Sequence, residues 1–169
     1  MAQLSHEQVS RSKAPYSLKL VCDGVSGPAN IGSLFRLADA FGVQEIVFGN
    51  SSPKFDSDRM KRTSRGADKW INYRSVEDLV GFLSAEQGSG SELIALEITQ
   101  DSAPIRQLKI VDHNRPIVLI IGAENRGVSP EVLQLPGLSV FHLPLYGRNS
   151  SINVAQAAAV ALYHITEQF

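Results

Sequence analysis

The sequence has little of what stabilises small secreted proteins or anchors proteins in membranes. Among its 169 residues there is one cysteine, Cys22, which excludes a disulfide framework and fits a reducing cytoplasm. The longest aliphatic run, Ile117 to Ile121, is far too short to span a bilayer. The N-terminal stretch up to Ser17 has no apolar segment of the kind that a secretory signal needs. We therefore expect a cytoplasmic protein without a membrane segment, in which Cys22 is a small buried hydrophobe within a strand.

Net charge is also nearly absent, at −1, and by itself neither favours nor excludes an anionic partner. Its distribution is uneven. From Lys54 to Arg74 there are seven basic residues against three aspartates, whereas from Ser75 to Asp101 there are six acidic residues and no Lys or Arg. Such a local positive excess fits a phosphate-binding surface or a solvated loop, and charge alone does not decide between the two.

The composition is that of a globular domain, with 43% hydrophobic and 20% charged residues. Short β-branched runs alternate with helical patterns. The expected strands are Leu18–Asp23, Glu45–Gly49, Trp70–Tyr73, Glu92–Ile98, Ile117–Gly122 and Val140–Leu143. The expected helices are Ile31–Phe41, Val76–Gln87, Ser129–Leu133 and Ser151–Gln168. This alternation predicts a single α/β domain over residues 17–169, with a mostly parallel sheet flanked by helices, after a flexible N-terminal segment at residues 1–16.

Two of the expected helices carry further information. The first has one apolar stripe at helical spacing, made by Ile31, Leu34, Phe35, Ala38 and Phe41. Asn30, following Pro28, is its expected N-cap, and Arg36 lies away from the stripe, so core packing does not account for it. The last helix is apolar nearly all round, which predicts burial on more than one side, by the domain or by a second subunit.

Three loops that follow expected strands are rich in Gly, Asn and Ser, at residues 24–36, 120–129 and 143–155. In open α/β sheets ligands bind beyond the carboxyl ends of the strands. No loop contains the GxxxxGK[ST] of an ATP-binding P-loop, the GxGxxG of a dinucleotide turn or the GxSxG of a hydrolase elbow. The four histidines show no metal-ligand spacing, so we expect no metal site. The residues alone predict a ligand-binding domain and leave its ligand open.

The three loops also follow three ordered patterns. The first reads N-x-G-x-x-x-R from Asn30 to Arg36, followed by Phe41-Gly42, and the second reads G-x-E-x-x-G from Gly122 to Gly127. The third reads L-P-L-Y-G from Leu143, followed by S-I-N-V-A from Ser151. Over about residues 18–163 these patterns resemble the SpoU family of tRNA/rRNA 2′-O-ribose methyltransferases, within the SPOUT superfamily. The third departs from the family's I-P-M-x-G and S-L-N-V only by apolar exchanges.

The resemblance implies a fold and a cofactor that the residues alone do not predict. SpoU-like domains have a C-terminal trefoil knot, whose loops bind S-adenosyl-L-methionine, and they act as homodimers. The cofactor contacts that the resemblance implies are Leu96, Gly122, Leu143, Ser151 and Ile152. For Leu96, ordinary core packing is an almost equally good interpretation.

The resemblance also implies roles in catalysis. It places Arg36 at the reacting 2′-hydroxyl and its phosphate, with Asn30, Glu124 and Asn153 beside the active site. Helix capping is a competing explanation for Asn30 and for Ser151, whereas capping does not require Asn153, which is therefore the better functional candidate. Glu124 is alternatively a surface carboxylate. Within the basic segment, the expected RNA contacts are Lys61, Arg62 and Arg65.

The leading hypothesis is therefore an S-adenosyl-L-methionine-dependent RNA methyltransferase that modifies a ribose 2′-hydroxyl of tRNA or rRNA. A non-catalytic RNA-binding or assembly protein with the same fold is the alternative, and the intact motif residues count against it. A nicotinamide-dependent Rossmann enzyme is disfavoured by the missing GxGxxG. The sequence does not identify the RNA or the nucleotide.

Overall fold

The computed structural model describes residues 14–169. Its strands are β1 (Leu18–Asp23), β2 (Glu45–Gly49), β3 (Asn72–Val76), β4 (Glu92–Leu96), β5 (Ala103–Pro104), β6 (Ile117–Gly122) and β7 (Ser139–His142). Its α-helices are α1 (Pro28–Ala40), α2 (Asp58–Ser64), α3 (Leu79–Gly88), α4 (Pro130–Leu133) and α5 (Val154–Thr166). Two 3₁₀ turns, η2 (Ala67–Lys69) and η3 (Ile105–Gln107), complete the described elements.

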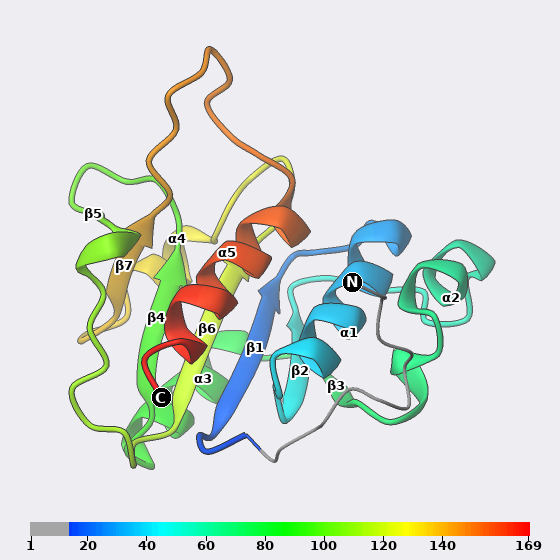
Figure 1. Ribbon diagram of the computed structural model, residues 1–169, viewed down its shortest axis with the longest axis horizontal. Coiled ribbons are helices and arrows are strands. Elements are labelled where there is room, and N and C mark those ends of the chain that lie inside the picture. Colours follow the sequence, from blue (N-terminus) through cyan, green and yellow to red (C-terminus); the bar gives the residue numbers. More distant parts are fainter. Residues whose placement is uncertain (1–13) are drawn as a thin grey trace, which may run out of the picture.

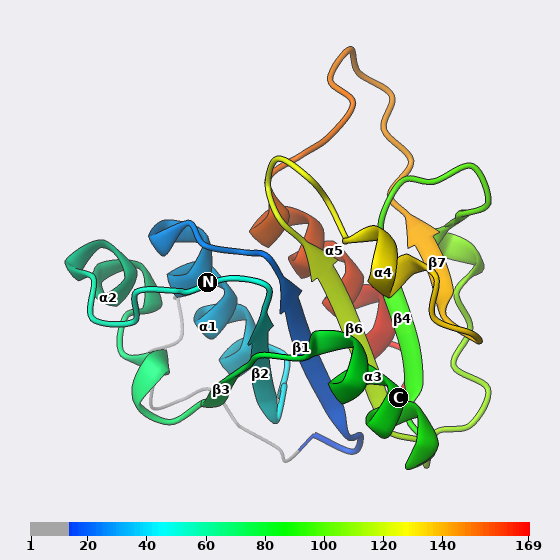
Figure 2. The same cartoon turned by 180° about the vertical axis from the view of Figure 1, so that it is seen from behind.

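The strands form one sheet in the order β3-β2-β1-β6-β4-β7-β5. Every pairing between these strands is parallel. Helices α1 and α5 cover one face of the sheet (Figure 1), and α3 and α4 cover the other (Figure 2). The predicted α/β architecture, a parallel sheet flanked by helices, is confirmed. Most of the expected flexible segment 1–16 lies outside the described residues.

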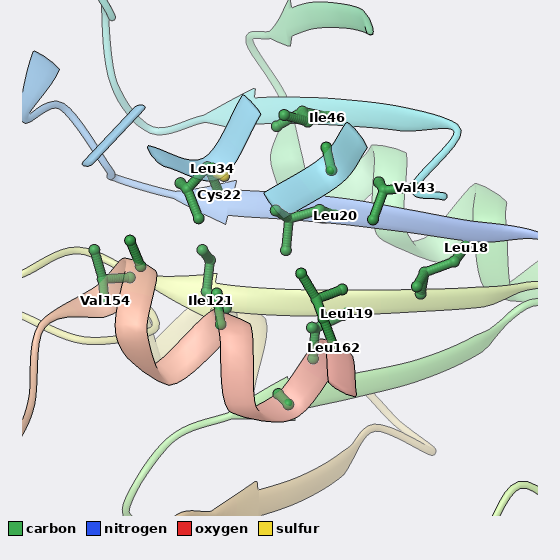
Figure 3. Packing of buried hydrophobic residues seen from close by; sticks show 14 of the residues in the cluster. Leu18, Leu20, Cys22, Leu34, Val43, Ile46, Leu119, Ile121, Val154 and Leu162 are labelled. Atoms are coloured by element: carbon green, nitrogen blue, oxygen red, sulfur yellow. The ribbon is translucent and has the colours of Figure 1, made fainter. Parts of the chain in front are cut away.

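The core explains why the central strands were easy to predict. Strands β1 and β6 are buried on both faces, as is usual for parallel strands between two helical layers. Leu20 and Cys22 of β1 face α1 and α5, together with Leu119 and Ile121 of β6 (Figure 3). The alternate residues, such as Val21, belong to a second cluster against α3. Cys22 is a buried strand residue, as predicted, and desolvation raises the pKa of its thiol, with a smaller contribution from the charge of Glu124.

Several predicted boundaries were wrong at the sheet edge. Strand β3 begins at Asn72, two residues later than expected, and includes Val76, which was assigned to the next helix. Four of its five residues are exposed, so no hydrophobic pattern marks it. The helix that follows begins at Leu79, because the Asp78 side chain caps it by accepting the Gly81 N–H at 2.8 Å.

Two predicted helix caps were also wrong. Helix α1 begins at Pro28 with Gly27 as its N-cap, so Asn30 lies in the first turn and its side chain is free for other contacts. Helix α5 begins at Val154, and its cap is Asn153 rather than Ser151. The Asn153 Oδ1 accepts the N–H groups of Ala155, at 3.0 Å, and of Gln156, at 3.3 Å. Asn153 therefore has the structural role that sequence analysis assigned to Ser151.

Helix α5 is buried on one side in the single chain. Its sheet-facing residues are Val154, Ala155, Ala158, Ala161, Leu162 and Ile165. On the opposite side Val160 is 46% exposed and Tyr163 59% exposed. No helix within residues 14–169 has the length and apolar character needed to cross a membrane.

Candidate active site

A cavity of about 550 Å³ lies at the carboxyl edge of the sheet, between the loops that follow β4, β6 and β7. This is where an open α/β sheet binds its ligands, and the volume is that of a small-molecule site. All five residues expected to contact the cofactor line it, namely Leu96, Gly122, Leu143, Ser151 and Ile152. The structure thus brings together residues from three separate segments of the chain.

The loop after β6 has the shape that its glycines permit. Ala123 and Gly127 exchange both backbone hydrogen bonds, at 3.0 and 2.9 Å, so that Glu124, Asn125 and Arg126 form the tip of a tight turn. A Cβ at Gly122 would overlap the Gly127 carbonyl carbon and the Val128 nitrogen. Gly127 has a φ of +68°, a conformation that favours glycine. The G-x-E-x-x-G spacing therefore has a steric reason.

Glu97 fixes this turn from the neighbouring strand. Its Oε2 accepts the Val128 N–H at 2.7 Å, and its Oε1 accepts the Ile98 N–H at 2.8 Å. It also lines the cavity. Sequence analysis missed Glu97 because the strand was expected to continue to Ile98. Its place directly after the last residue of β4, at the ligand-binding edge, was the available signal.

A second carboxylate holds the far end of the same loop. Asp23, the last residue of β1, is buried and accepts the Ser129 N–H at 2.7 Å and the Ser129 hydroxyl at 2.6 Å. Its other oxygen accepts the Asn50 amide at 2.8 Å. Hydrogen bonds to an ionised carboxylate are among the strong ones, so Asp23 anchors the loop between β6 and α4. Sequence analysis included Asp23 only as the end of a strand.

Three of the expected catalytic residues form one hydrogen-bonded chain. The Asn153 amide donates to the Asn30 Oδ1 at 2.9 Å, and the Asn30 amide donates to the Glu124 Oε1 at 2.6 Å. Asn153 also caps α5, so its amide group is fixed at both ends. We call Asn30, Glu124 and Asn153 the amide chain. It connects all three sequence motifs at the rim of the cavity.

Arg36 lies in a second cavity, of about 570 Å³, between α1 and α5. Its side chain is exposed and forms none of the ion pairs found within residues 14–169. Asn30 lines this second cavity, and Asn153 lines both. The two cavities therefore meet at the amide chain, which separates Arg36 from the cavity at the carboxyl edge of the sheet.

The expected RNA contacts lie elsewhere. Lys61 and Arg62 are on α2, Arg65 directly follows it, and all three are exposed and line neither cavity. Helix α2 packs closely on α1 because Gly32 has no side chain, since a Cβ there would lie 2.8 Å from the Thr63 Cβ. Gly32 of the first motif thus positions the basic segment beside the helix that carries Arg36.

Fold and site together define a parallel α/β domain with a pocket lined by the second and third motifs, to which Asn30 of the first motif is hydrogen-bonded. The model of the SpoU rRNA Methylase family matches residues 17–163, and the chain belongs to that family.

Similar proteins in this family include enzymes for two kinds of RNA. The tRNA (guanosine(18)-2′-O)-methyltransferase of Thermus thermophilus is 32% identical over 162 residues, which cover 96% of this chain and 80% of that enzyme. The 23S rRNA (guanosine(2553)-2′-O)-methyltransferase RlmP of Bacillus subtilis is 31% identical over 148 residues, and the chain spans 56% of its length. A crystal structure of an AdoMet-bound rRNA methyltransferase from Sinorhizobium meliloti matches with a TM-score of 0.77 and 25% identity. That match covers 88% of this chain and 55% of the solved one.

Proposed function

We propose that this protein is an S-adenosyl-L-methionine-dependent methyltransferase that modifies a ribose 2′-hydroxyl of tRNA or rRNA. The observation that carries the proposal is the meeting of two cavities at Asn153, one lined by the expected cofactor residues and one by Arg36. A transfer reaction needs such an arrangement, because donor and acceptor must approach from different sides with their reacting atoms adjacent. The names of the Thermus and Bacillus relatives support the same reaction class.

The cavity at the carboxyl edge of the sheet fits the cofactor by its chemistry. Leu96, Leu143 and Ile152 offer apolar walls for a nucleoside, and Gly122 lets its backbone pack directly against that of Gly127 and Val128 in the loop that lines the cavity. Glu97 and Glu124 supply carboxylates, which suit a ligand carrying a sulfonium and an ammonium group. When bound, S-adenosyl-L-methionine supplies an activated methyl group, so little further chemical activation is required of the protein.

In this proposal Arg36 binds the RNA at the reacting nucleotide. A guanidinium has five N–H donors and no acceptor at neutral pH, so Arg36 orients the 2′-hydroxyl and its phosphate instead of removing the proton. The hydroxyl proton leaves to the RNA phosphate or to water as the new carbon–oxygen bond forms. The amide chain holds the boundary between the two cavities at a fixed geometry.

The direct test measures methyl transfer from tritiated S-adenosyl-L-methionine to bulk tRNA and rRNA. Arg36→Ala should lower the rate by about a hundredfold or more, because a misplacement of the reacting group by about 1 Å costs on that scale. Its melting temperature should match the wild type, because exposed substitutions change stability by less than about 0.5 kcal/mol. Arg36→Lys should not restore the rate, since an ammonium cannot replace a planar fork.

Arg106→Ala is the matched control, because Arg106 is also exposed and lines neither cavity. It should leave methyl transfer unchanged. Near-normal turnover by Arg36→Ala at saturating RNA would remove Arg36 from the mechanism. Failure of the wild type to methylate either RNA, despite binding S-adenosylhomocysteine, would contradict the proposed function.

The proposal includes the remaining implications of the resemblance. Residues 17–169 form the methyltransferase domain, and the loops after β6 and β7 make a trefoil knot around the cofactor. The exposed apolar side of α5, with Val160 and Tyr163, supports a homodimer, because such a surface is stabilised by a second subunit. Lys61, Arg62 and Arg65 contact RNA phosphates in the cytoplasm.

A further inference from the structure

Trp70 combines high exposure with a fixed orientation. It is the single tryptophan of the chain and lies between η2 and β3, with 59% of its surface exposed. Its indole N–H nevertheless donates to the Asp39 Oδ1 on α1 at 3.0 Å. The ring also packs over Gly66, where a Cβ would lie 3.5 Å from the indole Cη2. An exposed aromatic ring held by a hydrogen bond and a backbone contact loses little conformational entropy when it binds a ligand.

The surroundings of Trp70 are positively charged. Arg62, Arg65 and Lys69 are exposed and take part in none of the ion pairs within the described chain. Arg65 and Gly66 both have positive φ, of 50° and 94°, and this tight turn brings the end of α2 next to Trp70. The two nearby carboxylates are already hydrogen-bonded. Asp68 accepts a hydrogen bond from the Ser64 hydroxyl, and Asp39 accepts one from the indole N–H of Trp70.

The anchor of Trp70 also relates it to Arg36. Asp39 and Arg36 are three residues apart on α1, and residues at that spacing are neighbours on a helix surface. The indole is therefore attached about one helical turn from the residue that we place at the reacting nucleotide.

We propose that Trp70 is a stacking platform for an unpaired nucleobase of the RNA substrate, close to the methylated nucleotide. This inference rests on the proposed function. Flat aromatic side chains among basic residues are the usual means of binding single-stranded nucleic acid, because each base offers a ring face and each nucleotide a phosphate. A second copy of the chain is the less favourable occupant, because a symmetric contact here would bring the same cations together.

Intrinsic fluorescence gives a direct test, because Trp70 is the only tryptophan. The probe is a single-stranded oligoribonucleotide of about 12 nucleotides, within the range of site sizes known for single-strand binders. Titration should quench the emission saturably through stacking. The same oligonucleotide annealed to its complement should quench much less at equal concentration, because its bases are already stacked.

Variants separate stacking from folding. Trp70→Ala should weaken single-strand affinity by about five- to a hundredfold, the scale of one lost base–aromatic stack. Trp70→Phe keeps a flat ring and should retain most of the affinity. Val111→Ala is the control, because Val111 is 91% exposed and lines neither cavity. All three variants should keep the wild-type melting temperature and affinity for S-adenosylhomocysteine.

The outcomes distinguish this inference from the proposed function. If the wild type transfers methyl groups to RNA, but the oligonucleotide does not quench its fluorescence and Trp70→Ala keeps the wild-type single-strand affinity in calorimetry, the stacking platform is refuted and the proposed function stands. If light scattering shows that Trp70→Ala converts a dimer to monomers while single-strand affinity is unchanged, Trp70 belongs to a subunit interface and the inference is wrong. If the wild type neither binds RNA nor transfers methyl groups, both proposals fail together.

Discussion

Asn153 has two structural roles, and substitution can separate them. Its Oδ1 caps α5, and its amide donates to Asn30 in the amide chain. Asn153→Ala removes both interactions. Loss of the cap costs about 1 kcal/mol, and loss of the exposed hydrogen bond costs about 0.5–1 kcal/mol. The total, about 1.5–2 kcal/mol, corresponds to a fall in melting temperature of roughly 3–8 °C for a domain of this size.

Asn153→Ser is the matched variant. A serine hydroxyl also caps a helix, so only the hydrogen bond to Asn30 is lost and stability should fall by about 0.5–1 kcal/mol. Serine is too short to reach Asn30, so the amide chain is broken in both variants. We therefore expect methyl transfer to fall about tenfold or more in both, although the alanine variant, which also loses the cap, should melt earlier than the serine variant.

The measurements are calorimetric melting, titration with S-adenosylhomocysteine and single-turnover methyl transfer at saturating RNA. Wild-type turnover by Asn153→Ser would show that Asn153 is only a helix cap and that the amide chain does not serve catalysis. An unchanged melting temperature for Asn153→Ala would refute the capping argument itself.

Three further predictions concern the cofactor loop, the basic segment and the core. Gly122→Ala should weaken S-adenosylhomocysteine binding by about tenfold or more, because the new Cβ overlaps the backbone of Gly127. Binding is measured by calorimetry, and the control is Gly88→Ala, whose Cβ would meet no atom within 4 Å. Simultaneous alanine substitution of Lys61, Arg62 and Arg65 should weaken RNA binding and flatten its salt dependence by about 0.7 per lost phosphate contact. If the salt dependence of RNA binding does not change, these three residues form only a solvated surface. The triple variant should bind S-adenosylhomocysteine as tightly as the wild type, whichever result is obtained. Cys22 should resist iodoacetamide at pH 8 until guanidinium unfolds the protein, as mass spectrometry can show, because burial raises the thiol pKa. The pKa of the Cys22 thiol is higher in the folded than in the unfolded state. Its contribution to stability is therefore fully present below the pKa of the unfolded state, and it is lost as the pH rises from there toward the pKa of the folded state.

The parts of the fold that sequence analysis predicted well are those where burial dictates residue type. The bounds of β1 and β6 match the expected strands, because both are buried on two faces and read as continuous apolar runs. Helix α2 was missed, because a short charged helix has no apolar period to detect. Its position depends on a tertiary contact, the packing of its backbone against Gly32.

The site was predictable as a set of residues but not as a geometry. The family resemblance grouped Gly122, Ser151 and Ile152, and in the structure all three line one cavity. It did not show that Asn153 caps α5, nor that Asn30 bonds to Glu124, because these contacts join residues distant in sequence. Glu97 was missed because the strand was expected to continue to Ile98, and its contact with Val128 likewise joins residues distant in sequence.

The pairing of β1 with β6 has a consequence for how the protein is made. Leu18 pairs with Ile117, and the Asp23 carboxylate binds Ser129, 106 residues later in the chain. On the ribosome, β1 and β2 emerge early, but the strand that covers the other edge of β1 follows only after most of the chain is synthesised. At a synthesis rate of roughly 5–20 residues per second, the backbone groups on this edge of β1 remain unpaired for several seconds. Translational pauses between β2 and β6 should therefore favour aggregation of the nascent chain.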